Sequence, residues 1–108
     1  MYGLNDLSRV AHDTAALKGF HEKTPVFGVP GEDARHILSW LALIHTEVSE
    51  AAEEVRKGTV EGFTEELADV LIRVFDVCGA LKLDLDGAVE AKMQKSLLRP
   101  VKHGGKLV

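Results

Sequence analysis

Residues 34–57 read ARHILSWLALIHTEVSEAAEEVRK, and this stretch decides the fold. Its apolar residues recur at alternating spacings of three and four, at Leu41, Ile44, Val48, Ala51 and Val55. Such spacing is typical of one face of an α-helix. Lys57-Gly58 follows as a helix end, because glycine readily adopts the left-handed conformation found there. The stretch therefore predicts one long amphipathic helix.

Acidic residues lie along the rim of that apolar face. Glu47 and Glu50 are three residues apart, and after a gap of 15 residues Glu66 and Asp69 repeat the spacing. Residues three apart share a helix face, so each pair places two carboxylates side by side. If the apolar faces of the two helices pack together, four carboxylates converge and need a cation, for which Mg²⁺ or Mn²⁺ is suited. An ordinary exposed Glu-rich helix face is the competing interpretation.

The rest of the chain also has helical patterning. We expect further helices at residues 4–20, 63–82 and 85–98, separated in part by a Pro- and Gly-rich loop at residues 21–33. Asn5 or Asp6 is expected to cap the first helix, and Asp84 or Asp86 the last. No strand pattern is present, so the fold class is all-α with four helices.

One helix has apolar residues on two sides. Besides its main apolar face, the segment 63–82 carries a second stripe of Ile72, Phe75 and Gly79. A helix that is apolar on two faces needs more cover than its own chain supplies. We therefore expect this stripe to form a subunit contact in a homodimer or homotetramer.

Composition places the chain among small folded domains. The 108 residues are 45% hydrophobic and 28% charged, which predicts a single helical domain over residues 1–108, with a basic tail at 99–108. The net charge of −4 argues against a nucleic-acid partner. No apolar run has membrane-spanning length. The single cysteine forms no intrachain disulfide, so we expect a cytoplasmic protein.

The acidic pairs and the tail resemble a known family. Glu47-Val-Ser-Glu50-Ala-Ala-Glu53, the 15-residue gap and Glu65-Glu66-Leu-Ala-Asp69 resemble the signature of MazG-like nucleoside triphosphate pyrophosphohydrolases. The end of the chain, Arg99-Pro100-Val101-Lys102-His103-Gly104-Gly105-Lys106, is similar to the tail of a small single-domain branch. The branch usually carries Asn and Tyr where this chain has Ser96 and Val101. The resemblance implies a four-helix MazG-like bundle completed by oligomerisation.

The resemblance also implies an activity. Family members hydrolyse the α–β phosphoanhydride of a nucleoside triphosphate to a monophosphate and pyrophosphate, and nucleotide-pool cleansing is the implied purpose. The implied magnesium ligands are Glu47, Glu50, Glu66 and Asp69. A carboxylate with a raised pKa in such a cluster accepts a proton from water. Glu50 and Glu53 are both candidates for this base, and the number of metal ions stays open.

Residues outside the quartet are candidates for holding the substrate. Trp40 lies two helical turns before Glu47, where it would wall a nucleobase pocket by stacking. Basic side chains near the end of the chain would donate charge-assisted hydrogen bonds to phosphate oxygens, namely Lys92, Arg99, Lys102 and His103. The alternative functions are a dUTP- or phosphoribosyl-ATP-type pyrophosphohydrolase and a non-catalytic helical interaction module.

Overall fold

The computed structural model describes residues 2–99, and these residues form four α-helices and no strand. The helices are α1 (Leu4–Leu17), α2 (Glu32–Lys57), α3 (Val60–Ala80) and α4 (Leu85–Leu98). The predicted all-α class is confirmed, and α4 has the predicted bounds. Within the described range, every helix is too short or too polar to cross a membrane.

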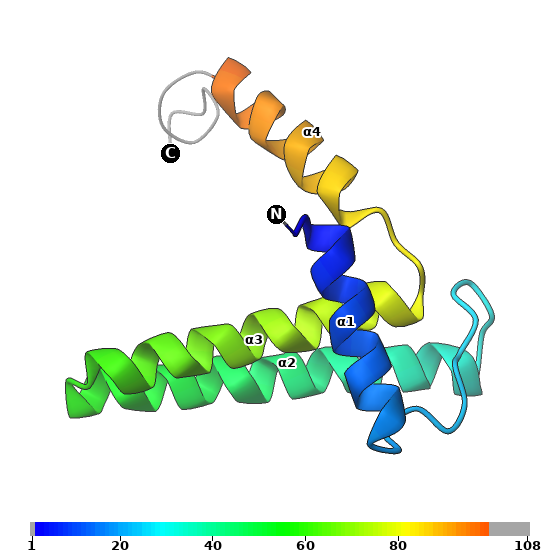
Figure 1. The fold of residues 1–108 in the computed structure, drawn as a ribbon, viewed down its shortest axis with the longest axis horizontal. Coiled ribbons are helices and arrows are strands. Elements are labelled where there is room, and N and C mark those ends of the chain that lie inside the picture. The colour runs from blue at the N-terminus through cyan, green and yellow to red at the C-terminus, as the bar shows by residue number, and fades with distance from the viewer. Residues whose placement is uncertain (1, 100–108) are drawn as a thin grey trace.

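The two long helices form an antiparallel hairpin. Figure 1 shows α2 and α3 side by side along most of their length, joined by a tight turn. Gly58 ends α2 in a left-handed conformation (φ 73°), and its N–H bonds to the carbonyl of Glu54 at 3.0 Å. Thr59, in extended backbone, is the N-cap residue directly before α3. The turn is so short that residues equally far from it face each other across the hairpin.

Helix α1 crosses the hairpin on the α3 side (Figure 1). The two helices approach closely at Gly79, where a Cβ atom would lie 2.3 Å from the carbonyl oxygen of Ser8 and 2.6 Å from the Cβ of His12. Ser8 is buried there, and its hydroxyl donates to the carbonyl of Leu4 at 2.8 Å. The Gly79 end of the predicted subunit stripe is therefore covered by α1 of the same chain, because glycine alone permits this approach.

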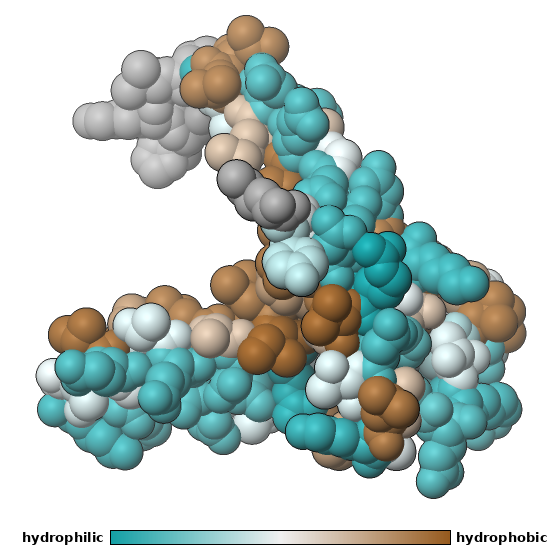
Figure 2. Space-filling view, in the orientation of Figure 1, coloured by the Kyte–Doolittle hydropathy of each residue, from teal (hydrophilic) through white to brown (hydrophobic). Residues whose placement is uncertain are grey.

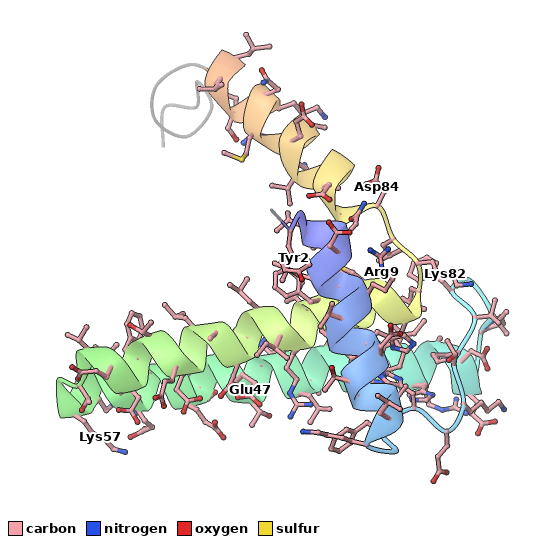
Figure 3. The ribbon with its side chains drawn as sticks, viewed as in Figure 1. Tyr2, Arg9, Glu47, Lys57, Lys82 and Asp84 are labelled. Carbon is pink, nitrogen blue, oxygen red and sulfur yellow. The ribbon has the colours of Figure 1, made fainter. Side chains whose placement is uncertain are left out.

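The N-termini of α1 and α4 cap each other. The main-chain N–H groups of Leu4 and Asn5 donate to the two carboxylate oxygens of Asp86, at 2.8 and 3.0 Å. In return, the side-chain oxygen of Asn5 accepts from the N–H groups of Leu85 and Asp86, at 2.9 and 3.1 Å. Asp84 caps its own helix by accepting from Gly87, as predicted. Figure 3 shows Asp84 beside the start of α1. Beyond this junction α4 extends away from the hairpin (Figure 1).

Four helix ends differ from the predicted ones. Helix α1 ends at Leu17 rather than residue 20, because Gly19 adopts a left-handed conformation (φ 83°). Helix α2 starts at Glu32, directly after Gly31 (φ 80°). Helix α3 begins earlier than predicted, at Val60, and ends at Ala80 before Lys82 turns left-handed (φ 55°). At the ends of α1 and α3, a left-handed residue shortly after the last turn stops the helix where apolar periodicity indicates continuation.

A single chain leaves much of its apolar surface uncovered. The fully buried apolar residues are small: Ala51, Cys78 and Ala80. Burial also raises the pKa of the Cys78 thiol, in keeping with its predicted core position. Large residues of the main apolar faces remain 44–64% exposed: Leu41, Val48, Val55, Leu67 and Leu71. Figure 2 shows apolar side chains along the α3 edge of the hairpin. The hairpin thus has more apolar surface than α1 covers.

Candidate metal centre

The hairpin brings the two acidic pairs together. Near the turn, the carboxylate of Glu54 lies against Gly62. One helical turn further from the connection, Glu50 contacts Glu66. Further still, Glu47 and Asp69 join Glu66, and these three residues offer carboxylate oxygens that lie within 4.8 Å of one another. The predicted convergence of the quartet therefore exists in the folded chain.

Glu66 is the centre of this cluster. Its Oε2 atom is buried and has no hydrogen-bond partner in the described part of the chain. Partial burial, then contact with the Glu50 carboxyl, and then the charges of Glu50, Asp69 and Glu47 raise the pKa of Glu66 above its ordinary value. An anion gathered with three others, and with one oxygen unpartnered, is costly unless a proton or a cation neutralises it.

One cation of the protein already touches the cluster. Arg73 donates from Nε to Oε1 of Glu47 at 3.1 Å, across the hairpin from α3 to α2. The Glu47 side chain is only 12% exposed, whereas that of Arg73 is 44% exposed. Figure 3 shows Glu47 partway along the hairpin. Arg73 offsets part of the charge at Glu47 and leaves the charge around Glu66 uncompensated.

The donor set fits a hard divalent ion. Mg²⁺ and Mn²⁺ prefer oxygen ligands, and Mg²⁺ is usually held by one or two carboxylates and substrate phosphates, with several waters retained. The unpartnered oxygen of Glu66 points to a missing positive partner inside the cluster. Binding would displace any proton held at Glu66, because a carboxylate binds metal in its ionised form. The residues present therefore fit the metal predicted from the sequence.

A cavity opens beside the cluster. It has a volume of about 730 Å³ and runs between α1, α2 and α3. Glu47, Asp69 and Arg73 line one part of it, and Trp40, His21 and Asp76 line another. Apolar residues form much of the remaining wall, including Leu7, Val10, Leu43, Ile72 and Phe75. An apolar cavity with carboxylates at one part suits a ligand with an aromatic group and a metal-bound polar group.

Trp40 lies in the wall of this cavity, and its stacking on a nucleobase stays a prediction. It is half-buried, and two imidazole rings meet it edge to face. The His36 ring centroid is 5.0 Å away, and that of His21 is 5.4 Å away. Edge-to-face contacts of this kind hold an aromatic ring in a defined orientation.

Other predicted site residues lie apart from the cluster. Glu53, one of the two candidate bases, is 56% exposed and pairs with Arg56 on the same helix, so the structure does not bring it to Glu66. Lys92 and Arg99 are exposed and do not line the cavity. The other two predicted phosphate contacts, Lys102 and His103, lie outside the described residues.

Lys18, His21 and Asp76 line the cavity but are not among the predicted site residues. Lys18 and His21 come from the end of α1 and the segment after it, where no periodicity indicates which way the chain turns. Asp76 comes from α3. Its spacing of seven residues from Asp69 places both acids on one α3 face and was the available signal.

Comparison with protein families gives one match. The model of the MazG nucleotide pyrophosphohydrolase domain matches residues 35–101, which is well over half of the chain. The matched range includes all four clustered carboxylates and Trp40. No match was found among curated proteins or among solved structures.

Proposed function

The chain belongs to the MazG nucleotide pyrophosphohydrolase family, and from this premise we propose a Mg²⁺-dependent hydrolysis of nucleoside triphosphates. The α–β phosphoanhydride of a ribo- or deoxyribonucleoside triphosphate breaks, and a monophosphate and pyrophosphate leave. The observation that supports this most is the gathering of Glu47, Glu50 and Asp69 around a buried, unpartnered oxygen of Glu66. Removal of unwanted nucleotides is the proposed purpose, and the cytoplasm is the proposed location.

The protein's own groups divide the work. Glu47, Glu50, Glu66 and Asp69 are the proposed metal ligands. A bound Mg²⁺ or Mn²⁺ supplies charge neutralisation at the phosphates and lowers the pKa of water. Glu50 is favoured over Glu53 as the base that accepts the proton of the attacking water, because Glu50 contacts Glu66 whereas Glu53 pairs with Arg56. The cavity wall around Trp40 would hold the nucleobase and exclude water from it.

Arg73 is the best-placed cation for the phosphates. It lines the cavity and contacts Glu47, so a phosphate oxygen bound there would accept a charge-assisted hydrogen bond. Lys92, Arg99, Lys102 and His103 remain proposed phosphate contacts. Lys92 and Arg99 lie outside this cavity, so they would act on a nucleotide held by another copy of the chain. The exposed apolar faces of α2 and α3 support a homodimer or homotetramer.

The products of hydrolysis test the proposed reaction. Incubation with a panel of ribo- and deoxyribonucleoside triphosphates, dUTP and phosphoribosyl-ATP, each with Mg²⁺, is expected to yield monophosphate and pyrophosphate from at least one triphosphate. Chromatography of the nucleotides with separate assays for pyrophosphate and orthophosphate resolves the outcome. Turnover of dUTP or phosphoribosyl-ATP alone would favour the corresponding alternative enzyme. Orthophosphate as the sole product would rule out the proposed cleavage.

Magnesium should stabilise the folded protein if the cluster binds it. At a Mg²⁺ concentration ten times the Kd, we expect a gain of about 1.4 kcal/mol, or about 5–10 °C in Tm. Partial burial, and after it the neighbouring carboxylates, keep the pKa of Glu66 raised, so without metal the folded state is favoured at acidic pH and loses that advantage as pH rises. A bound metal offsets the cost of the ionised Glu66 carboxylate near neutral pH. The rise in Tm caused by Mg²⁺ should therefore shrink at acidic pH, where Glu66 becomes protonated.

Thermal melts with Mg²⁺ and with K⁺ at matched ionic strength, at neutral and at acidic pH, measure this effect. The Glu66→Gln variant is the control, since it lacks the central charge and should show little magnesium shift. A non-catalytic interaction module predicts equal melts in both salts and no turnover. If Tm is the same in both salts but products still form, catalysis does not depend on metal binding at this cluster.

A further inference from the structure

Three side chains from three separate segments meet beside the cavity, away from the carboxylate quartet. His12 comes from α1, His21 from the segment that follows it, and Asp76 from α3. Nδ1 of His12 lies 3.2 Å from Oδ1 of Asp76. Nε2 of His21 lies 2.7 Å from Oδ1 and 2.9 Å from Oδ2 of the same carboxylate. One ligand-type atom of each residue lies within 4.8 Å of those of the other two.

The cluster is built into the fold. The His21 side chain is only 4% exposed, and those of His12 and Asp76 are 22% and 23% exposed. The His12 and His21 rings meet edge to face with centroids 4.6 Å apart. The close approach of α1 at Gly79, one turn after Asp76, brings His12 against α3. The packing of the α1 backbone on α3 thus sets the separation of His12 and Asp76, independently of the hydrogen bond between them.

Hydrogen bonds alone do not satisfy this cluster. Nδ1 of His21 is buried and has no partner within the described residues. Both oxygens of Asp76 are already engaged by imidazole nitrogens. That nitrogen is not the one that faces Asp76, so the case for a bound ion rests on the convergence of Nδ1 of His12, Nε2 of His21 and the Asp76 carboxylate.

We propose that Nδ1 of His12, Nε2 of His21 and a carboxylate oxygen of Asp76 form a second metal site, for a transition-metal ion such as Zn²⁺. Imidazole nitrogen suits Zn²⁺, Co²⁺ and Ni²⁺, whereas Mg²⁺ prefers oxygen. Ligands at about 2.0–2.1 Å in a tetrahedron lie about 3.3 Å from one another. The 3.2 Å between Nδ1 of His12 and Oδ1 of Asp76 is already close to this value. The 2.7 Å between Nε2 of His21 and the same oxygen must widen by about 0.6 Å.

The proposed ion has room for a further ligand. His21 and Asp76 line the cavity, so a fourth position would face it, as in zinc sites that keep one position open. Asp76 is seven residues after Asp69, which is about 10 Å along α3. The two metal sites would therefore lie at different parts of one cavity and differ in chemistry, one with carboxylate ligands and one mostly with imidazole. This inference does not depend on the proposed hydrolysis.

Cobalt provides a direct test, because Co²⁺ replaces Zn²⁺ and gives strong visible bands when it is four-coordinate with nitrogen ligands. The full chain is titrated with Co²⁺ in excess Mg²⁺, which occupies the carboxylate quartet. We expect bands that saturate at one equivalent. His12→Gln and Asp76→Asn each remove one ligand and are expected to weaken Co²⁺ binding by about 100-fold or more.

Two further variants locate the bound ion. His36→Gln is the matched control, because His36 contacts Trp40 but lies outside the three-residue cluster. The visible Co²⁺ bands of this variant should be the same as those of the unmodified chain. Glu66→Gln should also keep the bands. Absent bands in the unmodified chain, bands that persist in a folded His12→Gln variant, or bands lost in Glu66→Gln would each overturn the site. Circular dichroism establishes that every variant remains helical.

Discussion

Replacing Asp69 with asparagine is expected to lower the rate of pyrophosphate release by about 1,000-fold. Asparagine keeps the shape of aspartate but removes one negative charge from the proposed metal ligands. A bound metal contributes several kcal/mol to charge stabilisation in such reactions, and a loss of about 4 kcal/mol corresponds to this factor. Steady-state pyrophosphate release in saturating Mg²⁺ measures the effect. Glu50→Gln is expected to act in the same direction, both as a lost ligand and as a lost base.

The neighbouring Glu65 provides the matched control. It lies on α3, is exposed and is not part of the cluster, so Glu65→Gln removes the same charge from the same helix outside the site. Its turnover should stay close to that of the unmodified chain. If Asp69→Asn, with its helicity intact, also retained full turnover, the quartet would have no part in the mechanism.

Replacing Gly79 with alanine is expected to destabilise the fold strongly. The added Cβ would lie 2.3 Å from the Ser8 carbonyl oxygen, and a backbone atom held in a helix has little freedom to move. Helix α1 must shift away from α3, at a cost of about 3 kcal/mol, the upper end for overpacking. For a domain of this size that lowers Tm by more than about 10 °C. Thermal and denaturant unfolding followed by circular dichroism measure it.

Gly62 allows the same substitution in the same helix with the opposite expectation. A Cβ there would meet only the carboxylate end of Glu54, which can swing aside. Alanine is the better helix former, so Gly62→Ala should stabilise α3 by about 0.5–1 kcal/mol. Equal effects of the two substitutions would show that the α1–α3 crossing at Gly79 does not limit stability.

The sequence predicted those parts of the fold that depend on local pattern. Apolar periodicity located α1, α2 and α3, a predicted Asp cap located the start of α4, and Gly58 marked the hairpin turn because it adopts a left-handed conformation. The predicted cap of α1 is present at Asp6, whose carboxylate accepts from the Gly3 N–H at 3.0 Å, but Asp86 of α4 also caps α1 and Asn5 caps α4 in return. Local sequence does not reveal such an exchange, because the donors and acceptors are about 80 residues apart.

The candidate site divides in the same way. Spacing along two helices was enough to predict that Glu47, Glu50, Glu66 and Asp69 converge, because a short hairpin connection fixes which residues face each other. Spacing did not predict that His21 enters the cavity, since it follows Gly19, where the chain turns in a direction without periodic signal. Which of Glu50 and Glu53 faces the cluster depends on the rotation of α2 about its axis, and packing against α3 sets that rotation.

The position of Trp40 has a practical consequence. It is the only tryptophan in the chain, and it stands in the cavity wall between two imidazole rings. Fluorescence excited selectively in tryptophan therefore originates from one place in the molecule, next to where a nucleobase is proposed to sit. Occupancy of the cavity can be followed by the emission of the unlabelled protein, which carries its own optical reporter.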